Sequence, residues 1–447
     1  MDEKKMLMTE GTIWKVLVRF ALPLFFGGLF QQLYNAVDSW VVGRFCGDTA
    51  LAAVSSSGSL CFLLIGFFQG VFMGGSVIIS RYFGARDEEN VDRSIHTLIV
   101  FSIVLGIVLS ILGIIFTPTL LRWMGTPDNV LPQSVAYFRI FCSGLLALVL
   151  YNTATGIFQA LGDSKHPLYY LILASLLNVV LDFWFVAGLD MGVEGAALAT
   201  VLGQMFSAII AFAHLMSGKF VVKVELKKLR PHWFILKQIF SIGLPSGVQN
   251  SVIALANVVV QSNINVFGNY AMAGCGSYSK VEGFVFLPIM SLTMAMTTFI
   301  SQNLGAKNRS RARKGAVQGT FITMACAEII GITYFIFAPN VISLFSNTPE
   351  VLQYGVQQAH VMTLFYFVLA FSHCGAAILR GAGKSIVPMI VMLSVWCVFR
   401  IIYITVMVRM IPDIFIVFTA YPVTWTISSV IFFISLKRKD WTKTSFS

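Results

Sequence analysis

Twelve long apolar runs dominate this sequence of 447 residues. Each run is about 20 residues or longer, the length that an α-helix needs to cross roughly 30 Å of hydrocarbon. The runs cover residues 14–38, 52–80, 95–117, 133–160, 167–188, 193–216, 236–266, 272–301, 315–338, 352–379, 386–409 and 413–435. We therefore expect an all-α polytopic membrane protein with twelve transmembrane helices.

The composition agrees with a chain that lives in the lipid bilayer. Only 11% of the residues are charged and 57% are hydrophobic, whereas a soluble domain carries about 25% charged residues. A soluble enzyme of this length needs a polar surface that this chain cannot supply. The seven cysteines form no CxxC pair, so we interpret them as packing residues. We expect no enzyme and no resident cofactor.

The basic residues indicate the orientation of the chain in the membrane. The formal net charge is +11, and 25 of the 31 Lys and Arg fall in the N-terminal segment, alternate loops and the C-terminal tail. The opposite loops hold only Arg44, Arg122 and Arg409. Because short cytoplasmic loops are enriched in Lys and Arg, both termini are predicted to be cytoplasmic, in the cell inner (plasma) membrane. This bias explains the charge without nucleic acid.

The two halves of the sequence repeat each other. Three motifs recur at a spacing of 221 residues: 47–52 as 268–273, 80–86 as 301–307, and 161–167 as 382–388. Each half holds six runs, so the halves share one orientation and are predicted to be pseudo-symmetric six-helix bundles with a cleft between them. The predicted domains are an N-lobe (1–216), a cytoplasmic linker (217–235) and a C-lobe (236–447). That architecture suits alternating access.

A few acids fall inside the apolar runs, where a charge is costly and usually functional. Asp38 and Asp182 are predicted to share one level in the outer half of the N-lobe, together with Thr200. Asn178 lies four residues before Asp182, on the same helical face. Such oxygen ligands suit Na⁺, and two carboxylates in a low dielectric suit a shared proton equally well. The alternatives are an interfacial Asp38 and a packing hydrogen bond at Asp182.

Other residues are weaker candidates for a functional role. Glu282 lies two residues from Lys280, a spacing that does not place them on one helical face. Arg400 is a candidate partner of Glu328 or of a substrate. Pro23 and Pro245 occupy matching places in the first and seventh runs, where each is either a fixed bend or a hinge.

These residues resemble the multidrug and toxic compound extrusion (MATE) family. The resemblance rests on residues 21–23, 31–38, 42–44 and 50–53, and on the paired loops at 159–163 and 379–383. It implies a two-lobed antiporter with an N-lobe cation site. The residues that match that site are Asp38, Asn178, Asp182 and Thr200, with Tyr34 and Asn152 as neighbours. A second branch of the family uses acids in the seventh and tenth spans, and this chain has none there.

The expected function is secondary active multidrug efflux. The resemblance implies export of organic, often cationic and amphipathic compounds in exchange for inward Na⁺ or H⁺. The expected partners are drug-like small molecules and the lipid bilayer, with the protein acting as a monomer. The alternatives are a flippase for lipid-linked sugars and an exporter of small organic acids or metabolites. In the last case Arg400 has a larger role.

Overall fold

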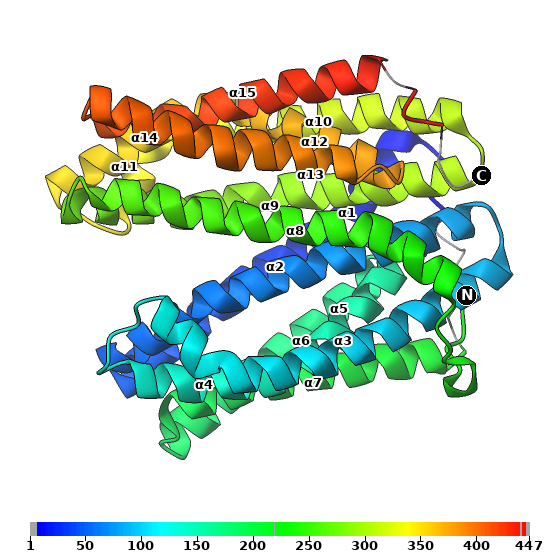
Figure 1. The fold of residues 1–447 in the computed structure, drawn as a ribbon, viewed down its shortest axis with the longest axis horizontal. Coiled ribbons are helices and arrows are strands. Elements are labelled where there is room, and N and C mark those ends of the chain that lie inside the picture. The colour runs from blue at the N-terminus through cyan, green and yellow to red at the C-terminus, as the bar shows by residue number, and fades with distance from the viewer. Residues whose placement is uncertain (1–6, 219, 439, 444–447) are drawn as a thin grey trace. The chain divides into compact units, whose positions relative to one another are not determined.

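The computed structural model describes residues 7–218, 220–438 and 440–443, and all regular structure in these ranges is helical (Figure 1). Of the basic residues used to orient the chain, Lys4, Lys5, Lys219 and Lys439 lie outside the described residues. The all-α fold expected from the apolar runs is confirmed.

The helices of the first half match the first six apolar runs. They are α1 (Ile13–Cys46), α2 (Asp48–Gly84), α3 (Glu88–Trp123), α4 (Leu131–Ser143), α5 (Leu145–Ala160), α6 (Lys165–Asp182), the π-helical segment η1 (Phe183–Gly188) and α7 (Gly192–Met216). Several helices extend beyond the apolar runs, because polar residues continue the helix on one or both sides of the apolar stretch.

The second half has a similar order of elements after a short 3₁₀ turn, η2 (Leu226–Lys228), with an additional 3₁₀ turn, η3, and an additional helix, α14. They are α8 (Trp233–Asn265), α9 (Asn269–Gly305), α10 (Arg309–Ser343), α11 (Pro349–Met362), the 3₁₀ turn η3 (Thr363–Phe365), α12 (Tyr366–Gly381), α13 (Ile386–Met392), the π-helical η4 (Leu393–Phe399), α14 (Arg400–Met410) and α15 (Ile414–Arg438).

Within the described residues, eleven helices are long and apolar enough to span a membrane, and the bent pair α4 and α5 makes a twelfth. The predicted fourth span is therefore not one straight helix: its two parts meet at an angle of 47°. The bend lies at Gly144, where a Cβ would collide with the side chain of Val201 in α7. The lack of a side chain at Gly144 lets α7 pack closely against the bend.

The predicted internal repeat is confirmed in the local structure. Helices α2 and α9 have 37 residues each, and they begin 221 positions apart in the sequence. Arg86 and Lys307, which are also 221 apart, both have a φ of 59°. A positive φ is unusual for a residue with a side chain. The repeated motifs therefore form the same turn, down to its strained backbone position.

The described residues form two compact units. The first holds Phe26–Gly243, and the second holds Leu7–Phe25 together with the described residues from Leu244 onward. The limits of each unit fall inside a helix, within α1 and within α8. The lobe limits inferred from the sequence, 1–216 and 236–447, stay a prediction, since the units are divided elsewhere.

Hydrogen bonds and ring contacts hold the helix starts in these units. In the second unit, the Met8 N–H donates to Gln302 Oε1 at 2.9 Å. In the first unit, the Tyr82 hydroxyl donates to Gln238 Oε1 at 3.1 Å, and the rings of Phe101 and Phe240 lie 4.9 Å apart. The start of α1 therefore packs with the second unit, and the start of α8 with the first.

Candidate functional site

Three helices of the first unit bring polar side chains together. Tyr34 and Asp38 lie four residues apart on α1, and Asn178 and Asp182 have the same spacing on α6. This spacing places each pair on one helical face. Thr200 comes from α7, which packs against α6. Three separate helices thus contribute to the predicted group, which consists of Tyr34, Asp38, Asn178, Asp182 and Thr200.

The carboxyl groups of Asp38 and Asp182 interact directly, within hydrogen-bonding distance of each other. Asp182 is completely buried and Asp38 is half-buried. One oxygen of each carboxyl group, Oδ1, is buried without a hydrogen-bond partner among the described residues. Two facing carboxyl groups repel each other when both are ionised, and a proton or a cation between them removes that repulsion.

Asn178 links the acid of α6 to the backbone of α7. Its amide orientation is assigned from the hydrogen-bond network. In that orientation its nitrogen donates to Asp182 Oδ2 at 3.1 Å, and its oxygen accepts from the Thr200 N–H at 3.1 Å. The hydroxyl groups of Tyr34 and Thr200 also form a hydrogen bond. The contact with Asn178 orients Asp182, because the Asn178 amide is itself held by the Thr200 N–H of α7.

A small cavity of about 10 Å³ adjoins this network. It is lined by Tyr34, Leu171, Ala174, Ser175, Asn178, Thr200, Gly203 and Gln204. Such a volume is close to what one water molecule needs, about 10–15 Å³. The lining includes several side-chain oxygens, which are the ligands that hard cations prefer. The cavity therefore matches one small ion or one water beside the acids.

Apolar packing surrounds the site. Val41 and Val42 of α1 are fully buried with Tyr137 of α4 and Val186 of η1. The π-helical turn η1 begins directly after Asp182. Short π-helical turns inside α-helices occur frequently at functional sites. The carboxyl groups thus lie in an apolar surrounding where an electrostatic interaction is stronger than in water.

A second polar cluster lies in the other unit. The Tyr278 hydroxyl donates to Glu282 Oε1 at 3.0 Å and lies 2.8 Å from the Tyr366 hydroxyl. Arg400, only 1% exposed, donates from Nη2 to Thr424 Oγ1 at 3.0 Å. The predicted secondary candidates Glu282 and Arg400 therefore both belong to this cluster.

Comparison with known proteins identifies the family. The MatE family model matches residues 23–184 and again residues 245–406. This chain belongs to the MatE family. The two matches start 222 positions apart, in agreement with the internal repeat. As a member of the MatE family, the chain is a membrane transporter and not an enzyme.

The chain is similar to several MatE relatives along most of its length. It is 29% identical to the "Probable multidrug resistance protein YoeA" of Bacillus subtilis, over 87% of this chain and 86% of that protein. It is 28% identical to the "Probable multidrug resistance protein YpnP" of the same organism, over 87% of each chain. The solved structure of a MOP superfamily transporter from Pyrococcus furiosus shares its fold with a TM-score of 0.92, at 23% identity and 99% coverage of both chains.

Two sequence predictions about this MatE transporter need separate comment. Asn152 was predicted to neighbour the acids, but its Nδ2 donates to the Leu148 carbonyl of its own helix at 2.8 Å, and it does not line the cavity. Glu328 was considered a partner of Arg400, but its Oε2 accepts from the Phe367 N–H at 3.1 Å. Glu328 thus holds the first turn of α12, where a free N–H attracts a carboxylate.

Sequence reasoning missed three residues of the candidate site. Gln204 and Ser175 line the cavity, and Gln204 Oε1 is buried without a partner among the described residues. Tyr137, which is 7% exposed, lies within electrostatic range of both acids. Gln204 follows Thr200 by four residues, so the helical spacing alone was a usable signal. Tyr137 had no comparable signal, because only the packing of α4 brings it to the site.

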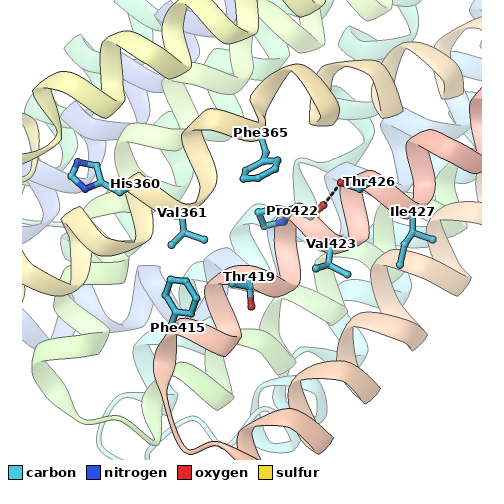
Figure 2. Close-up of a pocket in the computed structure, with 9 residues that line it drawn as sticks. All are labelled: His360, Val361, Phe365, Phe415, Thr419, Pro422, Val423, Thr426 and Ile427. Carbon is cyan, nitrogen blue, oxygen red and sulfur yellow. Dashed lines mark hydrogen bonds between the residues drawn. The ribbon is translucent and has the colours of Figure 1, made fainter.

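A groove in the described part of the second unit is apolar. It measures about 600 Å³ and lies between α11 with η3 on one side and α15 on the other (Figure 2). His360 is its one titratable lining residue, and an imidazole nitrogen of His360 lies 3.2 Å from the Phe335 carbonyl. No carboxylate lines this groove. Its chemistry is therefore that of apolar contact and not of cation binding.

Proposed function

We propose that this MatE transporter exports organic compounds in exchange for an inward-moving Na⁺ or H⁺, which binds at Asp38 and Asp182. One observation carries the proposal: two facing carboxyl groups, one fully buried, each keep a buried oxygen without a partner among the described residues. Buried charges in a membrane protein are expensive and are usually kept for ion or substrate pathways.

The proposed site binds either cation by the same electrostatic principle. A proton shared between the two carboxyl groups removes one of their negative charges. A Na⁺ ion bound by an oxygen of each carboxylate reduces the repulsion between both negative charges. Thr200 and Tyr34 supply further oxygens for Na⁺. Asn178 keeps Asp182 in place through its 3.1 Å hydrogen bond. A ligand that binds one conformation better than the other shifts the balance between them, and an exported compound with the opposite preference is coupled to the ion.

Pro23 and Pro245 are proposed as the hinges for this exchange. A proline inside a helix removes one backbone hydrogen bond and permits bending. Both prolines lie inside their helices, and each lies within two residues of a boundary between the compact units, after Phe25 and after Gly243. A bend at Pro23 changes the direction of the part of α1 that follows it, which carries Asp38.

The proposed substrates are drug-like, often cationic and amphipathic small molecules. The printed names of the Bacillus subtilis relatives as probable multidrug resistance proteins support this class. We propose that the protein acts as a monomer in the plasma membrane with both termini in the cytoplasm. The distribution of the basic residues supports that orientation.

Dye efflux from proteoliposomes tests the proposal, with Na⁺ and pH gradients imposed separately. Export of an ethidium-type cation should respond to one gradient or to both. Asp182→Asn should reduce the gradient-driven export rate at least about tenfold. The reason is that loss of one contact between the coupling cation and a charged carboxylate costs about 1.5–3 kcal/mol of binding free energy. The matched control is Asp190→Asn, at an exposed acid just beyond η1. Wild-type export that ignores both gradients, or unchanged coupling in Asp182→Asn, would refute the mechanism.

A further inference from the structure

Arg400 in the second unit is a buried cation whose donors are not all used. Its side chain is 1% exposed, and Nη2 donates to Thr424 Oγ1 at 3.0 Å. The guanidinium also lies 5.2 Å from the ring centre of Trp396 and 4.5 Å from that of Tyr421. Its Nε has no hydrogen-bond partner among the described residues. An unpaired buried donor is costly to keep, so a role beyond packing is indicated.

The two aromatic rings contact the Arg400 guanidinium without using its N–H groups as hydrogen-bond donors. A cation–π contact forms over the face of a ring and leaves the in-plane N–H donors of the guanidinium free. Those donors form the planar fork that binds a carboxylate through two parallel hydrogen bonds. Trp396 is itself fixed, because its Nε1 donates to Ser428 Oγ at 3.0 Å. The cluster thus holds a guanidinium in one orientation and keeps a donor available.

Glu282 supplies the opposite charge in the same cluster, and it too is held by neighbours. Its Oε1 accepts the Tyr278 hydroxyl at 3.0 Å, and that hydroxyl is 2.8 Å from the hydroxyl of Tyr366. Glu282 is half-buried, so it is reached from the surface of the unit, whereas Arg400 lies deeper. Both charges are therefore preorganised by separate sets of partners.

The two charges are close but do not pair. Each lies within electrostatic range of the other, yet in the described chain no nitrogen of Arg400 comes within the 4.0 Å that defines an ion pair with the Glu282 carboxylate. Opposite charges in a low dielectric attract strongly, so the surrounding hydrogen bonds and rings must hold them apart. A ligand with two charges of its own is able to bridge such a gap at little cost in ordering the site.

We propose that the Glu282–Arg400 cluster is a substrate subsite for organic zwitterions. The carboxylate of the substrate accepts a hydrogen bond from the unpaired Nε–H of Arg400, and its cationic nitrogen group is directed toward Glu282. The inference rests on the proposed export function and names a substrate class for it. It is separate from the cation site, which lies in the other unit.

A matched pair of dyes tests the subsite: a rhodamine with a free carboxylate and the methyl ester of the same dye. Binding to purified protein in nanodiscs is measured by fluorescence anisotropy without any ion gradient, so the result does not depend on coupled export. Wild type should bind the free acid at least about tenfold more tightly than the ester, the difference expected for one charge-assisted contact. Arg400→Gln should weaken binding of the acid by a similar factor and leave the ester within about twofold.

Two further variants complete the test. Arg409→Gln removes an exposed arginine from the same helix, α14, and should change neither dye. Glu282→Gln should weaken both dyes, because both carry the amine. Should Arg400→Gln not be recovered as a folded protein, Arg400→Lys keeps the charge without the fork and should lose acid binding selectively. Equal affinity of wild type for the two dyes, or equal losses for both dyes in the Arg400 variants, would overturn the proposal. Failure of gradient-driven efflux alone would instead refute the proposed antiport.

Discussion

A side chain added at Gly203 should disturb the cation site through one neighbour. Gly203 lies on α7 and faces Asn178 of α6. An added Cβ would lie 3.3 Å from Asn178 Cβ and 3.4 Å from the Ala174 carbonyl oxygen. Carbon atoms pack best at about 3.5–4.0 Å, so Asn178 must move by about 0.2–0.7 Å to accept the methyl group of Gly203→Ala.

That displacement is large enough to matter for Asp182. The Asn178 nitrogen now lies 3.1 Å from Asp182 Oδ2, already near the upper end of the usual range of about 2.7–3.2 Å. A shift of a few tenths of an ångström away from Asp182 lengthens the contact beyond that range. Loss of a hydrogen bond to a charged group costs about 1.5–3 kcal/mol, which corresponds to a 10- to 150-fold change in cation affinity at about 1.4 kcal/mol per factor of ten. For H⁺ the affinity should rise, because the lost hydrogen bond had favoured the ionised carboxylate.

The assay is dye efflux from proteoliposomes as a function of Na⁺ concentration and of pH. Gly203→Ala should shift the half-maximal cation concentration by about tenfold, the lower end of that range, and Gly203→Val, which adds two more methyl groups, by more than that. The control is Gly156→Ala in α5, where the nearest atoms to an added Cβ are 3.9 Å away. This control has the same gain in helix propensity, about 0.5–1 kcal/mol, without the steric contact.

The reasoning fails if Gly203→Val folds and keeps the wild-type dependence on both cations. It also fails if Gly156→Ala changes coupling as strongly as Gly203→Ala does, because the effect would then come from helix stiffness. Thermal unfolding measured alongside efflux separates a misfolded variant from a folded variant with a displaced Asn178.

Three further predictions address single residues. Asn152→Ala should leave the cation dependence of efflux within about twofold of wild type, because its amide bonds to Leu148 in its own helix, whereas Asn178→Ala should weaken it by tenfold or more. Glu328→Ala should lower the thermal stability by about 1 kcal/mol through loss of the bond to the Phe367 N–H, with efflux unchanged; an unchanged melting temperature contradicts the capping role. Hydrogen bonds from Thr442 and Arg313 lower the pKa of Asp440 to about 2. The Asp440 carboxylate should contribute fully to the ordering of the C-terminal tail above a pH of about 4, and this contribution should be lost as the pH falls toward 2. An acid titration in which wild type and Asp440→Asn behave alike would argue against this role.

Much of the fold was predictable because it depends on local sequence. The apolar runs and the rule of about 20 residues per span predict helix number, and the helices confirm it. The repeated turn motifs keep the same backbone conformation at Arg86 and Lys307. The bend between α4 and α5 was not predicted, because the residue that packs closely against it at Gly144, Val201, lies more than 50 positions away in the sequence.

The candidate site was predictable in its membership and not in its contacts. Asp38 and Asp182 stood out because acids are rare in apolar runs. That their carboxyl groups meet, with Asn178 bridging to α7, depends on the packing of three helices. The place of Asn152 beside the acids stays a prediction; its Nδ2 donates to the Leu148 carbonyl of its own helix, as a polar residue in a span can do without any neighbour.

The sequence by itself determined that this chain lies in the membrane, that it is a duplicated six-helix unit, and which few charges it carries inside. These properties follow from hydrophobicity, spacing and repetition, which are local or periodic along the chain. Only the tertiary structure decided which of those charges meet and which are held apart. Asp38 contacts Asp182, while Arg400 contacts Thr424 and the Tyr421 ring and forms no ion pair with Glu282 among the described residues. Such pairings depend on contacts between residues distant in sequence, which close packing selects and no local pattern encodes.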